Sequence, residues 1–129
     1  MKLEELMLND WVLYNENLCK VARISERLFL EKDGKVFYAP IEKISPIPIT
    51  AEILEKNGFI KIKREGGSYE YEISEDFFDV LIYEWSDSIW VYRYDSTEMN
   101  LPHTQTTQSY VHELQHALRL NGIDKDIIL

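Results

Sequence analysis

The dipeptide Asp33-Gly34 constrains the fold of this chain more than any other local feature. It separates two short β-like segments, residues 27–31 and 35–38. Asp-Gly between alternating segments is a strong hairpin signal, because a two-residue type I′ turn needs positive φ at both central positions. The sequence therefore predicts a β-hairpin around this turn.

Further β-like segments surround the hairpin, at residues 10–14 and 19–24 before it and at residues 41–44 after it. Several short strands joined by tight turns are typical of a small SH3-like β-barrel. We therefore expect residues 1–49 to form an SH3-like β module. The remaining residues, 50–129, are expected to form a second module.

The second module is predicted to contain helices as well as strands. Thr50 is a suitable N-cap for a helix over residues 51–57, and Gly58 suits the position after that helix. Four antiparallel strands are expected within residues 59–94, followed by a polar loop and a helix over residues 110–121. This order predicts an α+β fold with both helices on one face of the sheet, and the two modules packed as one compact unit.

Composition limits the classes of partner and the compartment. The 129 residues carry a net charge of −9, which disfavours general binding to nucleic acid and suits either a basic protein partner or solubility alone. No signal-peptide pattern and no apolar segment of about 18 residues, the length of a membrane span, is present. Cys19, the single cysteine, excludes an internal disulfide and is expected to be a buried structural thiol. We expect a cytoplasmic protein.

Aromatic residues recur with a period of two in the second module. In a simple meander, the aliphatic side chains of Val80, Ile82, Ile89 and Val91 would lie beneath the helices, and the aromatic side chains would line the opposite face. The predicted aromatic set is Tyr69, Tyr71, Tyr83, Trp85, Trp90, Tyr92 and Tyr94. Such a face can stack a planar ligand, form an interface between copies of the chain, or be covered by the first module. The intervening Glu70 and Glu72 are interpreted as a solvated face.

The segment His112-Glu113-Leu114-Gln115-His116 matches the zinc-protease pattern H-E-x-x-H. In that chemistry two imidazoles bind Zn²⁺, the glutamate acts on the metal-bound water, and a third protein ligand completes the site. His103, in the polar loop, is the only other histidine.

A helical wheel argues against this metal site. With an advance of about 100° per residue, Tyr110, Val111, Leu114 and Leu118 form an apolar stripe that would dock on the sheet. His112 and His116 then point away from that stripe, into solvent. We therefore expect neither an enzyme nor a bound cofactor, and we keep as an alternative a zinc-dependent hydrolase that uses His112, Glu113 and His116.

Three stretches carry a family resemblance: MKLEELMLNDWV at the start, ISPIPITAEILEKNGF in the middle and YVHELQHALRLNGID near the end. In this order they resemble a family of small uncharacterised proteins from gut Bacteroidales and their phages and mobile elements. The resemblance implies no assigned activity, and it implies relatives with Gln or Asn in place of Glu113 or His116. It also implies a functional class, because small acidic phage proteins often occupy a host protein or sequester a signalling nucleotide.

Together these observations predict a non-enzymatic binding or accessory protein of phage or mobile-element type. Its partner would be an unidentified host or phage protein or a small nucleotide-like ligand, and the aromatic face could join copies into a homo-oligomer. A sponge for a nucleotide messenger in phage counter-defence, which stacks its ligand on the aromatic face, is the second alternative besides the zinc hydrolase.

Overall fold

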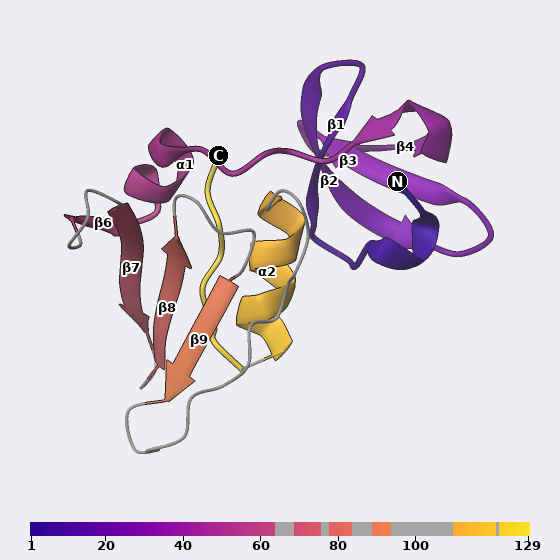
Figure 1. The fold of residues 1–129 in the computed structure, drawn as a ribbon. Coiled ribbons are helices and arrows are strands. Elements are labelled where there is room, and N and C mark those ends of the chain that lie inside the picture. The colour runs from indigo at the N-terminus through magenta and orange to yellow at the C-terminus, as the bar shows by residue number, and fades with distance from the viewer. Residues whose placement is uncertain (64–68, 76–77, 84–88, 94–109, 121) are drawn as a thin grey trace. The chain divides into compact units, whose positions relative to one another are not determined.

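The computed structural model describes residues 1–63, 69–75, 78–83, 89–93, 110–120 and 122–129 (Figure 1). These residues form mostly antiparallel β-sheet with two α-helices, so the predicted α+β class is confirmed. The chain divides into two compact units, one made of Met1–Pro48 with Tyr110–His112 and the other of Ile49–Ser109 with Glu113–Leu129. Within the described part of the chain, no helix is long and apolar enough to cross a membrane.

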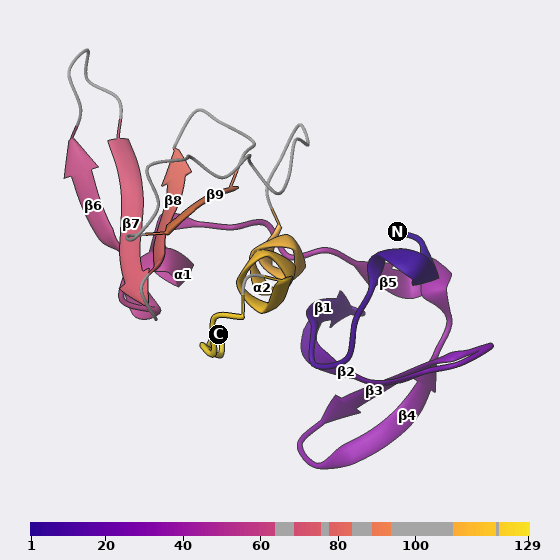
Figure 2. The same cartoon turned by 90° about the horizontal axis from the view of Figure 1, so that it is seen from below.

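The first unit contains a five-stranded antiparallel sheet in the order β4-β3-β2-β1-β5 (Figures 1 and 2). Its elements are η1 (Leu3–Glu5), β1 (Trp11–Tyr14), β2 (Asn17–Ile24), β3 (Leu28–Lys32), β4 (Lys35–Ala39), η2 (Ile41–Lys43) and β5 (Ile44–Ser45). In the described residues β4 and β5 lie at opposite ends of this order and do not pair, so no closed barrel is observed.

One expected strand of the first unit is largely a turn. Residues 41–44 were predicted as a strand, but Ile41–Lys43 form the 3-10 turn η2, and only Ile44–Ser45 pair with β1. A hydrogen bond of 3.0 Å from the Lys43 N–H to the Pro40 carbonyl closes this turn, and this local bond replaces the strand pairing that was expected. Ile41 and Ile44 are three residues apart, a spacing that puts both on one side of a 3-10 turn, and both pack in the core of the first unit.

The predicted hairpin is confirmed. Asp33 has φ 53° and Gly34 has φ 78°, the two positive values that a type I′ turn requires. The turn pairs Lys32 with Lys35, and the register continues without a shift to Leu28 opposite Ala39.

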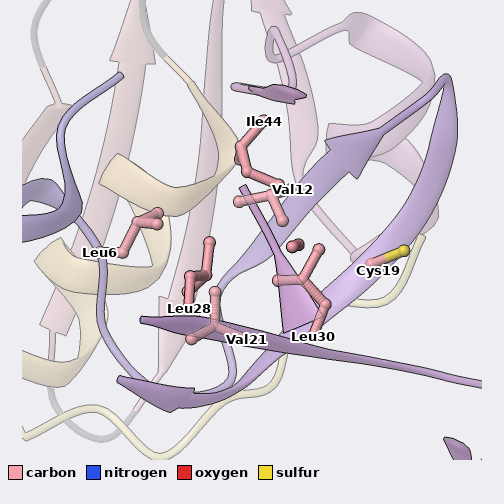
Figure 3. Close-up of a cluster of buried hydrophobic side chains, with 8 residues drawn as sticks. Leu6, Val12, Cys19, Val21, Leu28, Leu30 and Ile44 are labelled. Carbon is pink, nitrogen blue, oxygen red and sulfur yellow. The ribbon is translucent and has the colours of Figure 1, made fainter. Parts of the chain in front are cut away.

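The core of the first unit lies on one side of its strands (Figure 3). Its buried side chains are Leu6, Val12, Cys19, Val21, Leu28, Leu30, Ala39 and Ile44. Cys19 is fully buried, as expected from its place in an alternating strand. Asp10 is also fully buried, and one of its carboxylate oxygens accepts a hydrogen bond from the Met7 N–H at 2.8 Å.

The second unit contains a four-stranded antiparallel sheet in the order β6-β7-β8-β9. Its strands are β6 (Ile60–Lys63), β7 (Tyr69–Glu75), β8 (Phe78–Tyr83) and β9 (Ile89–Arg93), between the helices α1 (Ala51–Lys56) and α2 (Val111–Leu120). The predicted caps of α1 are confirmed: the Thr50 hydroxyl accepts a hydrogen bond from the Ile53 N–H at 3.2 Å, and Gly58 has φ 88°.

Asn57 fixes the C-terminal segment against the end of α1. Its amide donates to the carbonyls of Ile53 and Ile128, each at 2.8 Å, and its oxygen accepts from the Ile128 N–H at 2.7 Å. The Asn57 side chain is buried, and so are Ile123 and Ile127 of the segment that it holds. One polar side chain thus joins two parts of the second unit that are 71 residues apart in sequence.

We expect Asn57→Ala to lower the free energy of unfolding by about 2–3 kcal/mol, because buried backbone groups lose their hydrogen-bond partners. Urea denaturation followed by circular dichroism measures this loss. Asn17→Ala is the matched control: Asn17 is exposed and bonded to Lys32 and to the Asn15 carbonyl, and its loss should cost less than about 0.5 kcal/mol. Equal losses for the two variants would contradict the structural role of Asn57.

Candidate functional site

The predicted aromatic face of the second sheet is not assembled as expected. Tyr71 lies opposite Ile82 in the strand register, and Ile73 lies opposite Val80. Tyr71 therefore belongs to the aliphatic face, and it is buried, with 5% of its surface exposed. The prediction that Tyr71 lies on the face opposite Val80 and Ile82 is wrong, because directly paired residues point to the same side of a sheet.

The other predicted aromatic residues fall into two groups. The backbones of Tyr83, Trp90 and Tyr92 pair in register with Glu70, Leu81 and Asp79. Trp85 and Tyr94 lie outside the described residues. Tyr69 is half-buried, and the Lys61 ammonium lies 4.1 Å from the centre of its ring.

The solvated-face interpretation is wrong for Glu70, which is 1% exposed, while Glu72 is half-buried. Beside Glu72 lies a shallow hollow of about 380 Å³, lined by Gly58, Ile60, Ile62, Glu72, Ile73 and Ser74. The hollow is mainly apolar with one carboxylate at its wall.

Helix α2 confirms one half of the wheel analysis and corrects the other. Val111, Leu114 and Leu118 are buried, as predicted for the apolar stripe, and so is Ala117. His112 is buried as well, at 5% exposed, and its ring stacks on Tyr110 with the centroids 6.0 Å apart. The prediction of a solvent-facing His112 is therefore wrong. His116 and Glu113 are half-buried, and Leu120 is the most exposed side chain of the helix.

The H-E-x-x-H segment contributes two imidazoles and a carboxylate on adjacent turns of α2. Within the ranges that the structure describes, no group of three or more His, Cys, Asp or Glu side chains is placed to hold a metal ion. His103, the third ligand considered from the sequence, lies outside those ranges.

Cys19 is the only thiol in the chain. Burial raises its pKa, and the nearby Lys32 ammonium lowers it by a smaller amount. The neutral thiol is therefore favoured at physiological pH, which is the opposite of what an activated nucleophile needs.

A set of cations stacked on aromatic rings in the first sheet was not predicted from the sequence. Six residues form this aromatic–cation face: Trp11, Lys20, Arg23, Arg27, Phe29 and Tyr38. The Lys20 ammonium lies 4.8 Å from the Trp11 ring centre. The guanidinium carbons of Arg23 and Arg27 lie 5.6 Å and 5.5 Å from the rings of Phe29 and Tyr38. Those two rings meet edge to face, with centroids 6.2 Å apart.

The strand register explains why these residues share one face. Trp11 pairs with Lys20, and Phe29 pairs with Tyr38. The residues next to them along each strand point into the core. An irregularity in β2 between Val21 and Arg23 then brings Arg23 opposite Phe29. Alternation in the sequence indicates which side chains of a strand point outward, but it does not indicate the extra residue in β2.

The charge of the chain is unevenly distributed along it. Residues 1–48 contain seven basic and eight acidic side chains, whereas residues 49–129 contain seven basic and fifteen acidic ones. The aromatic–cation face thus belongs to the nearly neutral part of the chain. The net negative charge of residues 49–129 repels an anionic partner far more strongly than that of residues 1–48.

Comparison with known proteins gives no further assignment: no protein-family model, curated protein or solved structure matches the chain.

We expect His112→Ala to destabilise the protein more than His116→Ala, because only His112 is buried and stacked. The expected losses are about 2 kcal/mol for His112 and less than about 1 kcal/mol for His116, measured by urea denaturation. Similar small losses for both variants would contradict the burial of His112.

Proposed function

We propose that the protein is a non-enzymatic binding protein and that a protein partner docks on its aromatic–cation face. The observation that carries the proposal is the alignment of three cation–aromatic contacts on one face of the first sheet. Arg23 and Arg27 are exposed, and half of the Tyr38 surface is accessible. Aromatic residues and arginine are enriched where protein interfaces are energetically strongest.

The chemistry of the face defines the kind of partner that fits it. Each guanidinium can donate two parallel hydrogen bonds to a carboxylate, and the ring beneath it holds the arginine side chain in place before binding. Less side-chain entropy is then lost when the partner binds. Tyr38 and Val36, which is 59% exposed, lie two residues apart on β4 and add apolar area to this part of the sheet. The partner is therefore a protein segment that places an Asp or Glu beside an apolar side chain.

We also infer that the first unit is a small SH3-like barrel. Three features support this inference: β1 pairs with both β2 and β5, β2 is long and irregular, and the 3-10 turn η2 separates β4 from β5. In the second unit, the burial of Tyr71, Val80 and Ile82 on one face of the sheet supports helices on that face. An experimental structure of the full chain with a flat, open first sheet would overturn the barrel assignment.

We further propose, from the family resemblance, that the protein is an accessory factor of phage or mobile-element type, a class whose partners include host proteins. The proposed partner is therefore a protein of the host or of the phage. The proposed origin concerns only the class of partner. The choice of the docking face rests on the three cation–aromatic contacts.

We expect the double variant Arg23→Ala, Arg27→Ala to lose partner binding by about tenfold or more, since two interface cations are removed together. Partners are first captured by the tagged wild-type protein from a Bacteroidales lysate, and their affinity is then measured with purified proteins. Lys61→Ala is the matched control, because it removes a cation stacked on Tyr69 in the other sheet. A partner that binds the double variant and the wild type equally tightly would sink the proposal.

A further inference from the structure

Strands at the edge of a sheet differ in how well they are protected from pairing with another chain. Three edge strands have described side chains: β4, β5 and β6. β5 is only two residues long, and β6 exposes Lys61 and Lys63, which discourage pairing. β4 is five residues long and exposes Val36 and Tyr38, 59% and 50% accessible, with a charged residue only at its start. β4 is therefore the least protected of these three edges.

The hairpin turn determines which backbone groups of β4 face the open edge. In a two-residue hairpin the residues next to the turn, here Lys32 and Lys35, exchange both hydrogen bonds, and this pattern alternates along the strands. Phe37 and Ala39 therefore bond to β3. The N–H and C=O groups of Val36 and Tyr38 point away from β3, on a side where the described residues supply no pairing strand.

We infer that β4 pairs with β4 of a second copy of this chain, antiparallel and centred on Phe37. Val36 then lies opposite Tyr38 of the second copy, and each of the two such pairs exchanges two hydrogen bonds. Both sheets join into one continuous sheet across a two-fold axis, which is the usual symmetry of homodimers. The inference concerns the strand edge and does not depend on the partner proposed for the aromatic–cation face.

The sequence around β4 favours this register over the registers that are shifted by two residues. A shift of two residues in one direction would place Pro40, which has no N–H, opposite Val36. A shift of two residues in the other direction would place Gly34, within the turn, opposite Tyr38. The register centred on Phe37 also places Lys35 opposite Ala39, so that no like charges face each other.

The side chains are complementary in this register. Val36 beside Tyr38 is a β-branched–aromatic pair, and Phe37 lies opposite Phe37 of the second copy, both favourable combinations across strands. A five-residue strand buries less area than a standard interface, so the dimer should be weak and depend on concentration.

Single cysteine substitutions test the inference and the register together, since the native Cys19 is buried and contributes little background. In Phe37→Cys, the two new thiols would sit at a non-hydrogen-bonded pair with Cα atoms about 4.5 Å apart, which a disulfide can bridge. In the matched control Val36→Cys, the two thiols would lie on a diagonal about 7–8 Å apart and should remain reduced. The expected result is an oxidised dimer of Phe37→Cys on a non-reducing gel, and none of the control.

Two results from these variants would overturn the inference. Cross-linking of Val36→Cys in preference to Phe37→Cys would exclude this register. Failure of folded Phe37→Cys, checked by circular dichroism, to cross-link would exclude the β4–β4 pairing.

A second measurement covers the case in which Phe37→Cys fails to fold, since Phe37 also packs against Tyr14, with centroids 5.4 Å apart. In sedimentation at about 10 µM to 1 mM, a range suited to weak association, the wild-type mass should rise from 15.3 kDa toward twice that value. Val36→Pro should stay monomeric, because it removes an outward N–H and leaves the bonds between β3 and β4 in place. A wild-type protein that remains monomeric throughout, or a Val36→Pro variant that dimerises normally, would overturn the inference.

Discussion

The type I′ turn at Asp33-Gly34 is the constraint on which both surfaces of the first unit depend. Positive φ at these two residues, 53° and 78°, fixes the pairing of Lys32 with Lys35 and hence the register of all of β4. A slip of one residue would turn Tyr38 toward the core and Phe37 toward solvent, because side chains alternate between the two faces of a strand. The turn therefore selects the core residues, the aromatic–cation face and the backbone groups at the open edge in a single step.

Features set by neighbours in sequence could be predicted, and features set by distant pairing could not. The hairpin turn and the cap at Thr50 follow from the conformational preferences of one or two residues. The face on which Tyr71 lies depends instead on its register with β8, and a period of two cannot say which alternate residues of two strands share a side. The same limit concealed the aromatic–cation face, which needs the irregular residue in β2 to bring Arg23 opposite Phe29.

Buried polar side chains account for the remaining differences between prediction and structure. Helical periodicity locates the apolar stripe of α2 correctly, but it assigns His112 to the surface, as strand alternation does for Glu70. Both side chains are buried, and so is Asn57, whose burial was not predicted. For Asn57 the reason is visible, because its amide satisfies backbone groups of two segments at once. Such a role depends on tertiary contacts, and local pattern carries no signal for it.

The uneven charge of the chain bears on how two copies can associate. Residues 49–129 hold fifteen acidic against seven basic side chains, so an interface made of two such segments would bring like charges together. The first 48 residues are nearly balanced in charge, and pairing through β4 avoids that repulsion.

Pairing through β4 would also extend the aromatic–cation face across the two-fold axis, so that the Arg23 and Arg27 contacts occur twice on one continuous sheet. A partner with two acidic segments could then bind both copies, and the second contact would form at the high effective concentration set by the first. Dimerisation through β4 and binding of such a partner would thus each increase the affinity of the other.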